Sequence, residues 1–98
     1  MQLEWDIAKA ILNKKKHGIS FQEACYVFTD SYALTIFDLA HSLNEERWIT
    51  IGTVPESKVL VVVHTYREIN YNKTMRIISA RKATKKENDQ YYSRRPSK

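Results

Sequence analysis

Apolar residues follow two different periods along the chain, one before and one after about residue 33. In residues 7–29 they recur every three or four positions, which is typical of helices that pack one face on a core. From residue 33 to residue 80 they alternate or form short runs between polar segments, which is typical of strands. The pattern predicts helices first and a sheet afterwards.

A helix is predicted over residues 7–17, after a short strand candidate at residues 2–5. Asp6 precedes the helix as an N-cap, because its carboxylate can accept hydrogen bonds from the free N–H groups of the first turn. Gly18 follows the helix, at the position where a left-handed residue commonly ends one. The predicted apolar face of this helix consists of Ala8, Ile11 and Leu12.

A second helix is predicted from Ser20, which forms a capping-box pattern with Glu23. It ends near Asp30, and its apolar residues are spaced by three and four, so they should face the core. These residues are Phe21, Ala24, Cys25 and Phe28. The only cysteine of the chain is therefore expected to be a core residue.

Strands are predicted over most of the remaining chain, at residues 33–37, 47–54, 59–67 and 75–80. A tight turn at residues 55–58 joins two of them, whereas the polar segments 38–46 and 68–73 are predicted loops. The run at residues 59–63 is apolar on both faces, which predicts a central strand that is covered on both sides.

A second capping-box pattern, Thr84 with Glu87, predicts a C-terminal helix that ends near Tyr91. Two helices before an antiparallel sheet of four to five strands and one helix after it make an α+β domain. The predicted domain covers residues 1–92, and residues 93–98 are expected to form a disordered basic tail.

Composition narrows the possible classes of protein. The 98 residues are 43% hydrophobic, enough for one core. One cysteine excludes an internal disulfide, and no His or Cys pair has zinc spacing, so no metal or other cofactor is expected. No segment approaches the about 20 apolar residues of a membrane span, and the N-terminus lacks a signal-peptide pattern, so we expect a cytoplasmic protein. The net charge of +5 favours an anionic partner.

His64 and Arg67 follow the predicted central apolar run. Strand alternation places His64 on one face with Leu60 and Val62, and Arg67 on the other face. A histidine at the rim of this strand can act as a general acid or base near neutral pH. A structural histidine that is hydrogen-bonded to the backbone is the open alternative.

Arg76 and Arg81 lie within and at the end of the last predicted strand. An ion pair with Glu46 or Asp38 is the simpler interpretation of Arg76. Arg81 lies where the strand leads into the C-terminal helix, so the free N–H groups of that helix and the guanidinium together predict an anion site.

Further basic residues are candidates for contacts with a nucleic-acid backbone. Cations near a helix C-terminus are also favoured by the helix dipole without any function, so this alternative stays open for some of them. The candidates are Lys9, Lys16, His17, Arg47, Lys82 and Lys85.

Four segments of the sequence together resemble the BrnT toxin family. They are EWDIAKAILNKKKHGISFQEACYVFTD (residues 4–30), HSLNEERWITIG (41–52), VLVVVHTYRE (59–68) and RIISARKATKKE (76–87). The KHG-x-SF and RIISARKAT portions are specific, and the segments span nearly the whole chain. The insert EINYNK at residues 68–73 departs from the family pattern and lengthens the last hairpin.

The resemblance implies a RelE-like fold and the toxin of a bacterial type II toxin–antitoxin pair. Such a toxin is a ribonuclease that inhibits translation, and its partner, a BrnA-like antitoxin, masks it and also binds operator DNA. In RelE-like toxins, basic residues on the central strands and at the end of the last strand serve RNA cleavage. Arg81 matches the latter position, and Arg67 and His64 are carried over more loosely.

The implied mechanism needs no metal ion. A base takes the proton of a ribose 2′-hydroxyl, the oxygen attacks the adjacent phosphorus, and arginines neutralise the charge on the phosphoryl oxygens. The alternative is a non-catalytic or degenerate module that only binds an antitoxin or nucleic acid, because that function needs the same basic surface. A titrating His64 beside the phosphate would distinguish the enzyme from the binding module.

Overall fold

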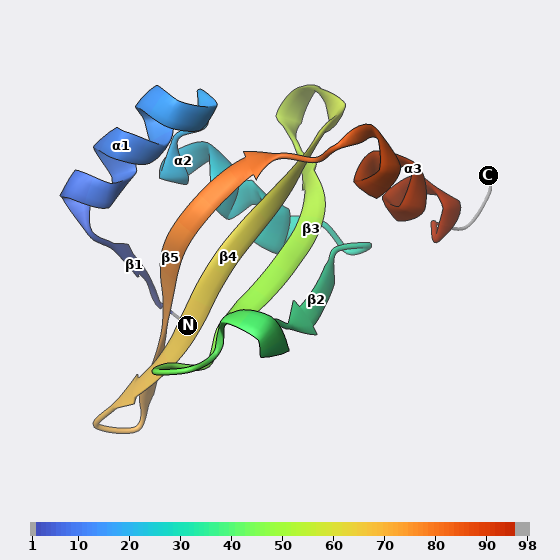
Figure 1. Cartoon of the computed structure of the whole chain (residues 1–98). Coiled ribbons are helices and arrows are strands. Elements are labelled where there is room, and N and C mark those ends of the chain that lie inside the picture. The colour runs from blue at the N-terminus through green and yellow to red at the C-terminus, as the bar shows by residue number, and fades with distance from the viewer. Residues whose placement is uncertain (1, 96–98) are drawn as a thin grey trace.

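A five-stranded sheet forms the centre of the protein, with strand order β1-β5-β4-β3-β2 (Figure 1). The computed structural model describes residues 2–95. The strands are β1 (Gln2–Trp5), β2 (Leu34–Phe37), β3 (Trp48–Val54), β4 (Lys58–Ile69) and β5 (Asn72–Lys82). Neighbouring strands are antiparallel except β1 and β5, which run parallel. The predicted α+β class is confirmed, and the sheet is mixed rather than wholly antiparallel.

Helices and short 3-10 turns connect and cover these strands. The helices are α1 (Ile7–His17), α2 (Phe21–Ala24) and α3 (Lys85–Ser93), and the 3-10 turns are η1 (Cys25–Thr29), η2 (Leu39–His41) and η3 (Pro55–Ser57). Helices α1 and α2 cover one face of the sheet, and α3 lies at its other side, beyond β3 (Figure 1). No helix among residues 2–95 is long and apolar enough to cross a membrane.

The predicted ends of α1 are confirmed. The Asp6 carboxylate accepts a hydrogen bond from the N–H of Lys9 at 3.0 Å, and Gly18 has a φ of 72°. The predicted apolar face is wrong, because Ile11 and Leu12 are 58% and 65% exposed. The helix instead turns Asn13 towards the core, where this side chain is 6% exposed.

Asn13 joins α1 to the last strand. Its amide nitrogen donates to the carbonyls of Ile19 and Ala80 at 3.0 and 2.9 Å, and its amide oxygen accepts from the N–H of Ala80 at 3.1 Å. The pairing of β1 with β5 ends at Ile77, three residues before Ala80. The Asn13 side chain thus continues the hydrogen bonding of β5 where β1 no longer can.

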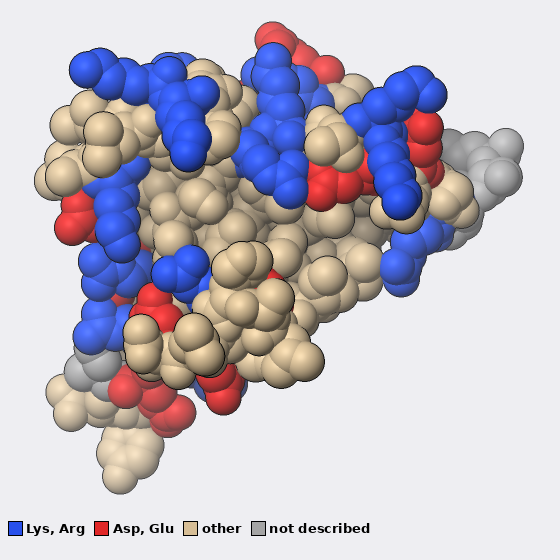
Figure 2. All heavy atoms as spheres, in the orientation of Figure 1, with Lys and Arg blue, Asp and Glu red and all other residues tan. Residues whose placement is uncertain are grey.

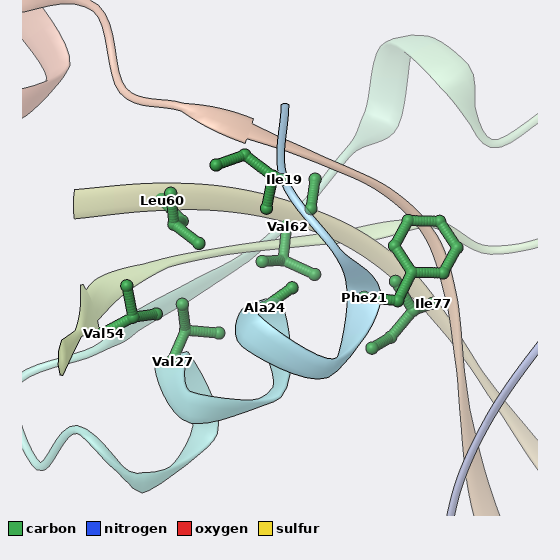
Figure 3. Close-up of a cluster of buried hydrophobic side chains, with 9 residues drawn as sticks. Ile19, Phe21, Ala24, Val27, Val54, Leu60, Val62 and Ile77 are labelled. Atoms are coloured by element: carbon green, nitrogen blue, oxygen red, sulfur yellow. The ribbon is translucent and has the colours of Figure 1, made fainter. Parts of the chain in front are cut away.

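The second helical segment is α-helical only as far as Ala24 and then tightens into the 3-10 helix η1. Ser20 caps it as predicted, accepting from the N–H of Glu23 at 3.0 Å, but the other half of the predicted capping box does not form, because the Glu23 carboxylate pairs with Lys58 at 2.7 Å instead. Its apolar face packs on the sheet and forms the main core (Figure 3). The core residues are Ile19, Phe21, Ala24, Val27, Val54, Leu60, Val62, Ile77 and Ala80. Cys25 and Phe28 are partly buried against this core.

The predicted loop at residues 68–73 is wrong, because β4 and β5 continue into it. Only Asn70 and Tyr71 form the turn, both with positive φ, 51° and 67°. Such a turn matches the twist of the two strands it joins. Nearer the core, β5 contains one residue more than β4. Val63 pairs with Ser79 and the next residue, His64, pairs with Ile77, so Ile78 has no partner in β4.

Helix α3 begins with the predicted capping box of Thr84 and Glu87. It ends at Ser93, two residues later than predicted, and the Arg95 guanidinium lies 4.7 Å from the ring centroid of Tyr32. Residues 93–95, which were predicted to belong to a disordered tail, are therefore part of the fold. The predicted tail residues 96–98 lie outside the described residues.

We expect Asn13→Ala to lower the free energy of unfolding by roughly 2–4 kcal/mol, because buried backbone groups at Ala80 and Ile19 lose partners that are each worth about 1–3 kcal/mol. Urea unfolding followed by circular dichroism measures this loss. Asn44→Ala, at an exposed loop position, is the matched control. An Asn13→Ala protein within 0.5 kcal/mol of wild type, roughly the range of neutral surface changes, would show that Asn13 does not hold α1 to β5.

Candidate functional site

Three arginines project from the face of the sheet that α1 and α2 leave uncovered. In the β4–β5 ladder, Arg67 lies opposite Thr74, Arg76 opposite Thr65, and Arg81 opposite Val61. These pairs face away from the core residues Leu60 and Val62, because side chains alternate between the two faces of a strand. The three guanidinium groups, Arg67, Arg76 and Arg81, are called the arginine row below.

The first arginine of the row lies beside a carboxylate from β1. Glu4 is the neighbour of Arg76 in the parallel pair, and its Oε1 lies 3.5 Å from Nη1 of Arg67. Both side chains are nearly half exposed, 49% for Arg67 and 42% for Glu4. A long ion pair at such exposure contributes little to stability, so most donors of Arg67 remain open to a ligand.

Arg76, the middle arginine, forms no ion pair within residues 2–95. The predicted pairing with Glu46 or Asp38 is therefore wrong, and Asp38 pairs with His41 at 3.0 Å instead. Next to Arg76 in the ladder, Thr65 is 2% exposed, and its hydroxyl has no hydrogen-bond partner among the described residues. Buried hydroxyls normally have a partner, so the Thr65 hydroxyl is an exception, and the middle of the row offers a cation that has no ion pair among the described residues.

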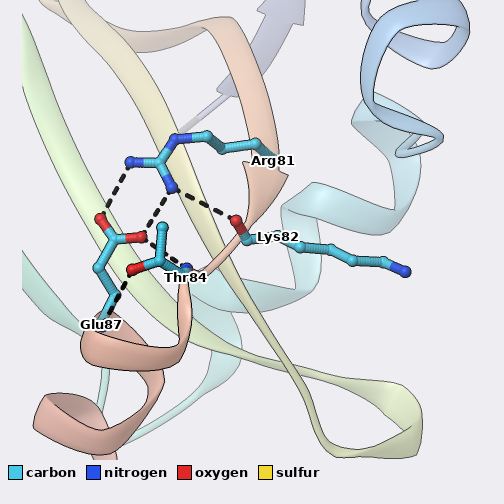
Figure 4. A network of polar contacts seen from close by, with 4 residues as sticks. All are labelled: Arg81, Lys82, Thr84 and Glu87. Atoms are coloured by element: carbon cyan, nitrogen blue, oxygen red, sulfur yellow. Dashed lines mark hydrogen bonds and ion pairs between the residues drawn. The ribbon is translucent and has the colours of Figure 1, made fainter.

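Arg81 is held by Glu87 (Figure 4). Its two terminal nitrogens donate to the two carboxylate oxygens at 2.7 and 2.9 Å, and Nη1 also donates to the carbonyl of Lys82 at 3.3 Å. Hydrogen bonds from the Arg81 guanidinium lower the pKa of Glu87 to about 2. This pair keeps the arginine charged and fixes its direction.

The predicted anion site at the start of α3 is occupied by the protein itself. Thr84 Oγ1 accepts from the N–H of Glu87 at 3.2 Å, and the Glu87 carboxylate accepts from the N–H of Thr84 at 2.8 Å. The capping box thus uses two of the free N–H groups that would have bound a phosphate. The sequence did contain a signal for this arrangement. Glu87 is the second residue of the predicted capping box, and it lies only six residues after Arg81.

His64 lies on the opposite face and is fully buried, so its predicted position at the rim is wrong. Its Nε2 is hydrogen-bonded to Thr50 Oγ1 at 2.7 Å, and its ring packs edge-on against Phe28 and Tyr66, each with centroids 5.2 Å away. Because β4 continues to Ile69, His64 lies inside the strand rather than near its end. Burial lowers the pKa of His64 from 6.5 to about 4.

The other predicted nucleic-acid contacts lie at three places around the row. Lys9, Lys16 and His17 line an open concavity of about 530 Å³ between α1 and the β5 residues Ile78 and Ser79. At the other end, Lys82 and Lys85 are exposed where β5 leads into α3. Arg47 immediately precedes β3, where its carbonyl accepts a hydrogen bond from Asp38 at 2.8 Å.

The basic residues border a largely uncharged area on this face of the protein. Figure 2 shows Lys and Arg side chains along the margin formed by α1 and the outer strands, above the end of β5, and over α3, with uncharged atoms between them. No group of three or more His, Cys, Asp or Glu side chains within residues 2–95 is arranged to hold a metal ion. The surface is suited to a long anion that crosses the sheet.

Comparison with known proteins identifies the family. Residues 5–87 match the family model described as "Ribonuclease toxin, BrnT, of type II toxin-antitoxin system". The chain is also similar to the 1.1 Å crystal structure of the Brucella abortus ribonuclease toxin BrnT, with a TM-score of 0.64 and 22% sequence identity. That likeness covers 87% of this chain and 99% of the other, and it shows a shared fold. No curated protein matches the sequence.

We expect the stability of the wild-type protein to fall between pH 6.5 and pH 4 because of His64. The folded state holds this histidine neutral down to about pH 4, whereas the unfolded chain binds the proton near pH 6.5, so acid favours unfolding. The full shift corresponds to about 3 kcal/mol. Urea unfolding of wild type at pH 7 and at pH 4.5 measures the loss.

In this experiment, His64→Gln should be less stable than wild type at pH 7 but should lose much less stability at pH 4.5. His41→Gln, with a side chain that is 70% exposed, is the control and should follow wild type. An identical pH dependence in His64→Gln and wild type would mean that another group causes the acid sensitivity.

Proposed function

Because the chain belongs to the BrnT family of ribonuclease toxins of type II toxin–antitoxin systems, we propose that it cleaves RNA at the arginine row. The reaction is a metal-independent attack by a ribose 2′-hydroxyl, and the loss of RNA inhibits translation in the cytoplasm. The observation that supports this proposal is the arginine row itself, in which Arg67 and Arg76 have donors free for phosphate oxygens. Guanidinium groups bind phosphate through paired, charge-assisted hydrogen bonds.

The proposed reaction forms one phosphorus–oxygen bond and breaks another. The 2′-oxygen attacks the adjacent phosphorus, its proton passes to a base, and the bond from phosphorus to the 5′-oxygen breaks as that oxygen takes up a proton. The products are a 2′,3′-cyclic phosphate and a 5′-hydroxyl. Negative charge on the phosphoryl oxygens increases in the transition state, and arginines fixed beside it stabilise that charge.

Glu4 is our candidate for the base. A base must contact the substrate, and His64 is buried on the opposite face of the sheet, so we do not assign it a role in proton transfer. Arginine stays protonated in proteins and cannot accept the proton. Glu4 lies on the face of the row, is 42% exposed in its side chain, and contacts Arg67.

The outlying cations guide the RNA to the row. Lys9, Lys16 and His17 bind the backbone on the α1 side, and Lys82, Lys85 and Arg47 bind it on the other sides. These contacts are electrostatic and independent of sequence, so binding should weaken steeply as salt increases. RNA is the required substrate, because only its 2′-hydroxyl supplies the internal nucleophile.

Membership of this family implies a cognate antitoxin as a partner. We propose that this antitoxin is BrnA-like, covers the toxin and also binds operator DNA. The non-catalytic alternative, a module that binds antitoxin or nucleic acid without cleavage, uses the same basic surface. A cleavage assay therefore distinguishes the ribonuclease from the non-catalytic binding module.

We expect Arg67→Ala and Arg76→Ala each to lower the RNA cleavage rate by about 10²–10³-fold, the effect of losing one transition-state donor. The melting temperature should change little, because Arg67 has only a long ion pair and Arg76 has none among the described residues. Lys86→Ala, an exposed change on α3, is the control. Cleavage of short labelled RNA, with product ends identified by mass spectrometry, is the measurement.

In the same assay, RNA with a 2′-deoxy nucleotide at the cleaved position should bind and stay intact, and a chelator should have no effect. Cleavage of that substrate, or a requirement for added magnesium, would refute the mechanism. A wild-type protein that binds antitoxin but cuts no RNA and does not arrest growth would support the non-catalytic alternative.

A comparison of two variants separates a structural role of Arg81 from a catalytic one. We expect Arg81→Ala and Glu87→Gln to destabilise the protein by similar amounts, about 1 kcal/mol, since each breaks the same partly exposed pair. Only Arg81→Ala should also lower cleavage about 10²-fold or more. Thermal unfolding and the cleavage rate are measured on both variants. Equal cleavage by the two variants would restrict Arg81 to a structural role.

A further inference from the structure

Strand β2 is an open edge of the sheet, since β3 is its only partner among residues 2–95. The N–H of Asp38 donates to the carbonyl of Arg47 on the β3 side at 2.8 Å. Main-chain groups in an antiparallel ladder face alternately towards the partner and away from it. The N–H and C=O groups of Phe37 and Thr35 therefore point to the open edge, where a further strand could pair with them.

An apolar groove lies beside this edge, on the same face of the sheet as the arginine row. It has a volume of about 440 Å³ and runs between β2 and α3. Its apolar lining comes from Tyr32, Leu34, Ile36, Ile51 and Tyr91. More apolar surface surrounds the strand, since Phe37 is 40% exposed, Leu39 81% and Leu43 94%. An apolar groove with further exposed apolar side chains around an open strand is typical of a protein–protein contact site.

The groove is positively charged at its α3 end. Arg94 lines it, and the Arg95 guanidinium lies over the neighbouring Tyr32 ring. The one carboxylate in the lining belongs to Glu87, which is already paired with Arg81. A matching ligand therefore has apolar side chains at alternate positions and a carboxylate that reaches Arg94.

We propose that β2 binds an extended, acidic and apolar segment of the cognate antitoxin, which adds to the sheet as a sixth strand. Main-chain hydrogen bonds to Thr35 and Phe37 hold it, and every second side chain enters the groove. The existence of this partner rests on the proposed function. A second copy of the chain fits less well, because pairing two β2 edges would bring two chains of net charge +5 together.

Three variants test separate parts of this proposal in the full chain. Ile36→Asp removes an apolar contact and adds a repelled charge, Arg94→Glu reverses the cation, and Thr35→Pro removes an N–H that faces the open edge. Thr35→Ala is the control for the proline, because it also loses the Thr35–Thr50 hydroxyl contact but keeps the N–H. Tyr71→Asp, at the far hairpin turn, is the control for an exposed charge.

Titration calorimetry with the purified cognate antitoxin should show each of the three variants binding about tenfold or more weakly than wild type and the two controls. All five proteins should melt cooperatively, and their RNA cleavage without antitoxin should equal that of wild type. In the complex, the amide protons of Thr35 and Phe37 should become protected from exchange. Overlapping 15-residue peptides of the antitoxin locate the segment.

Wild-type affinity in all three variants, unprotected amides at Thr35 and Phe37, or no antitoxin binding by wild type would each overturn the proposal. A free protein that is dimeric in sedimentation and becomes monomeric with Thr35→Pro would overturn it in favour of a second copy. If wild type cuts no RNA but β2 still binds the antitoxin as described, the proposed catalytic function fails and this inference stands.

Discussion

The carboxamide of Asn13 connects the two halves of the protein. It comes from the first helix and satisfies both backbone groups of Ala80 in the last strand, 67 residues away. An amide side chain can do this because it carries a donor and an acceptor side by side, as a peptide group does. Ala80 immediately precedes Arg81, the last arginine of the row, in β5. This contact therefore fixes α1 to β5 next to Arg81.

The sheet keeps two kinds of chemistry on opposite faces. Arg67 and His64 are three residues apart in β4, yet one is half exposed and the other is fully buried. The extra residue Ile78 lets Ile77 and Ala80 both face the core while Arg76 and Arg81 both face outwards. A histidine without solvent contact contributes packing and one hydrogen bond, whereas arginines at the surface remain available to anions.

Local signals in the sequence predicted local structure well. Asp6 with Gly18, and Thr84 with Glu87, mark the ends of α1 and the start of α3, because capping depends on residues that are close in the chain. The family and the α+β class could also be predicted, and three arginines of the candidate site were named from their strand positions. Their roles in RNA cleavage remain proposals.

Contacts between distant segments could not be predicted. Nothing local indicates that β1 pairs with β5, that Asn13 is buried while Ile11 is exposed, or that Glu4 reaches Arg67. The polar residues 68–73 predict a loop and so place His64 near a strand end, whereas β4 runs two residues further than predicted, to Ile69. Arg81 was assigned to a free anion site because its neighbour Glu87 was interpreted only as a cap.

The parallel pairing of β1 with β5 sets the order in which the protein can fold. The β4–β5 hairpin closes through a turn of Asn70 and Tyr71, and such hairpins form in about 1–10 μs. Gln2 must instead find Thr74 across almost the whole chain, and such distant contacts form slowly. We therefore expect Arg67 and Arg76 to be arranged early in folding and Glu4 to join them when the first strand docks. In that order of folding, a partly folded chain would present the cations proposed to bind RNA before it gains the carboxylate proposed to start the reaction.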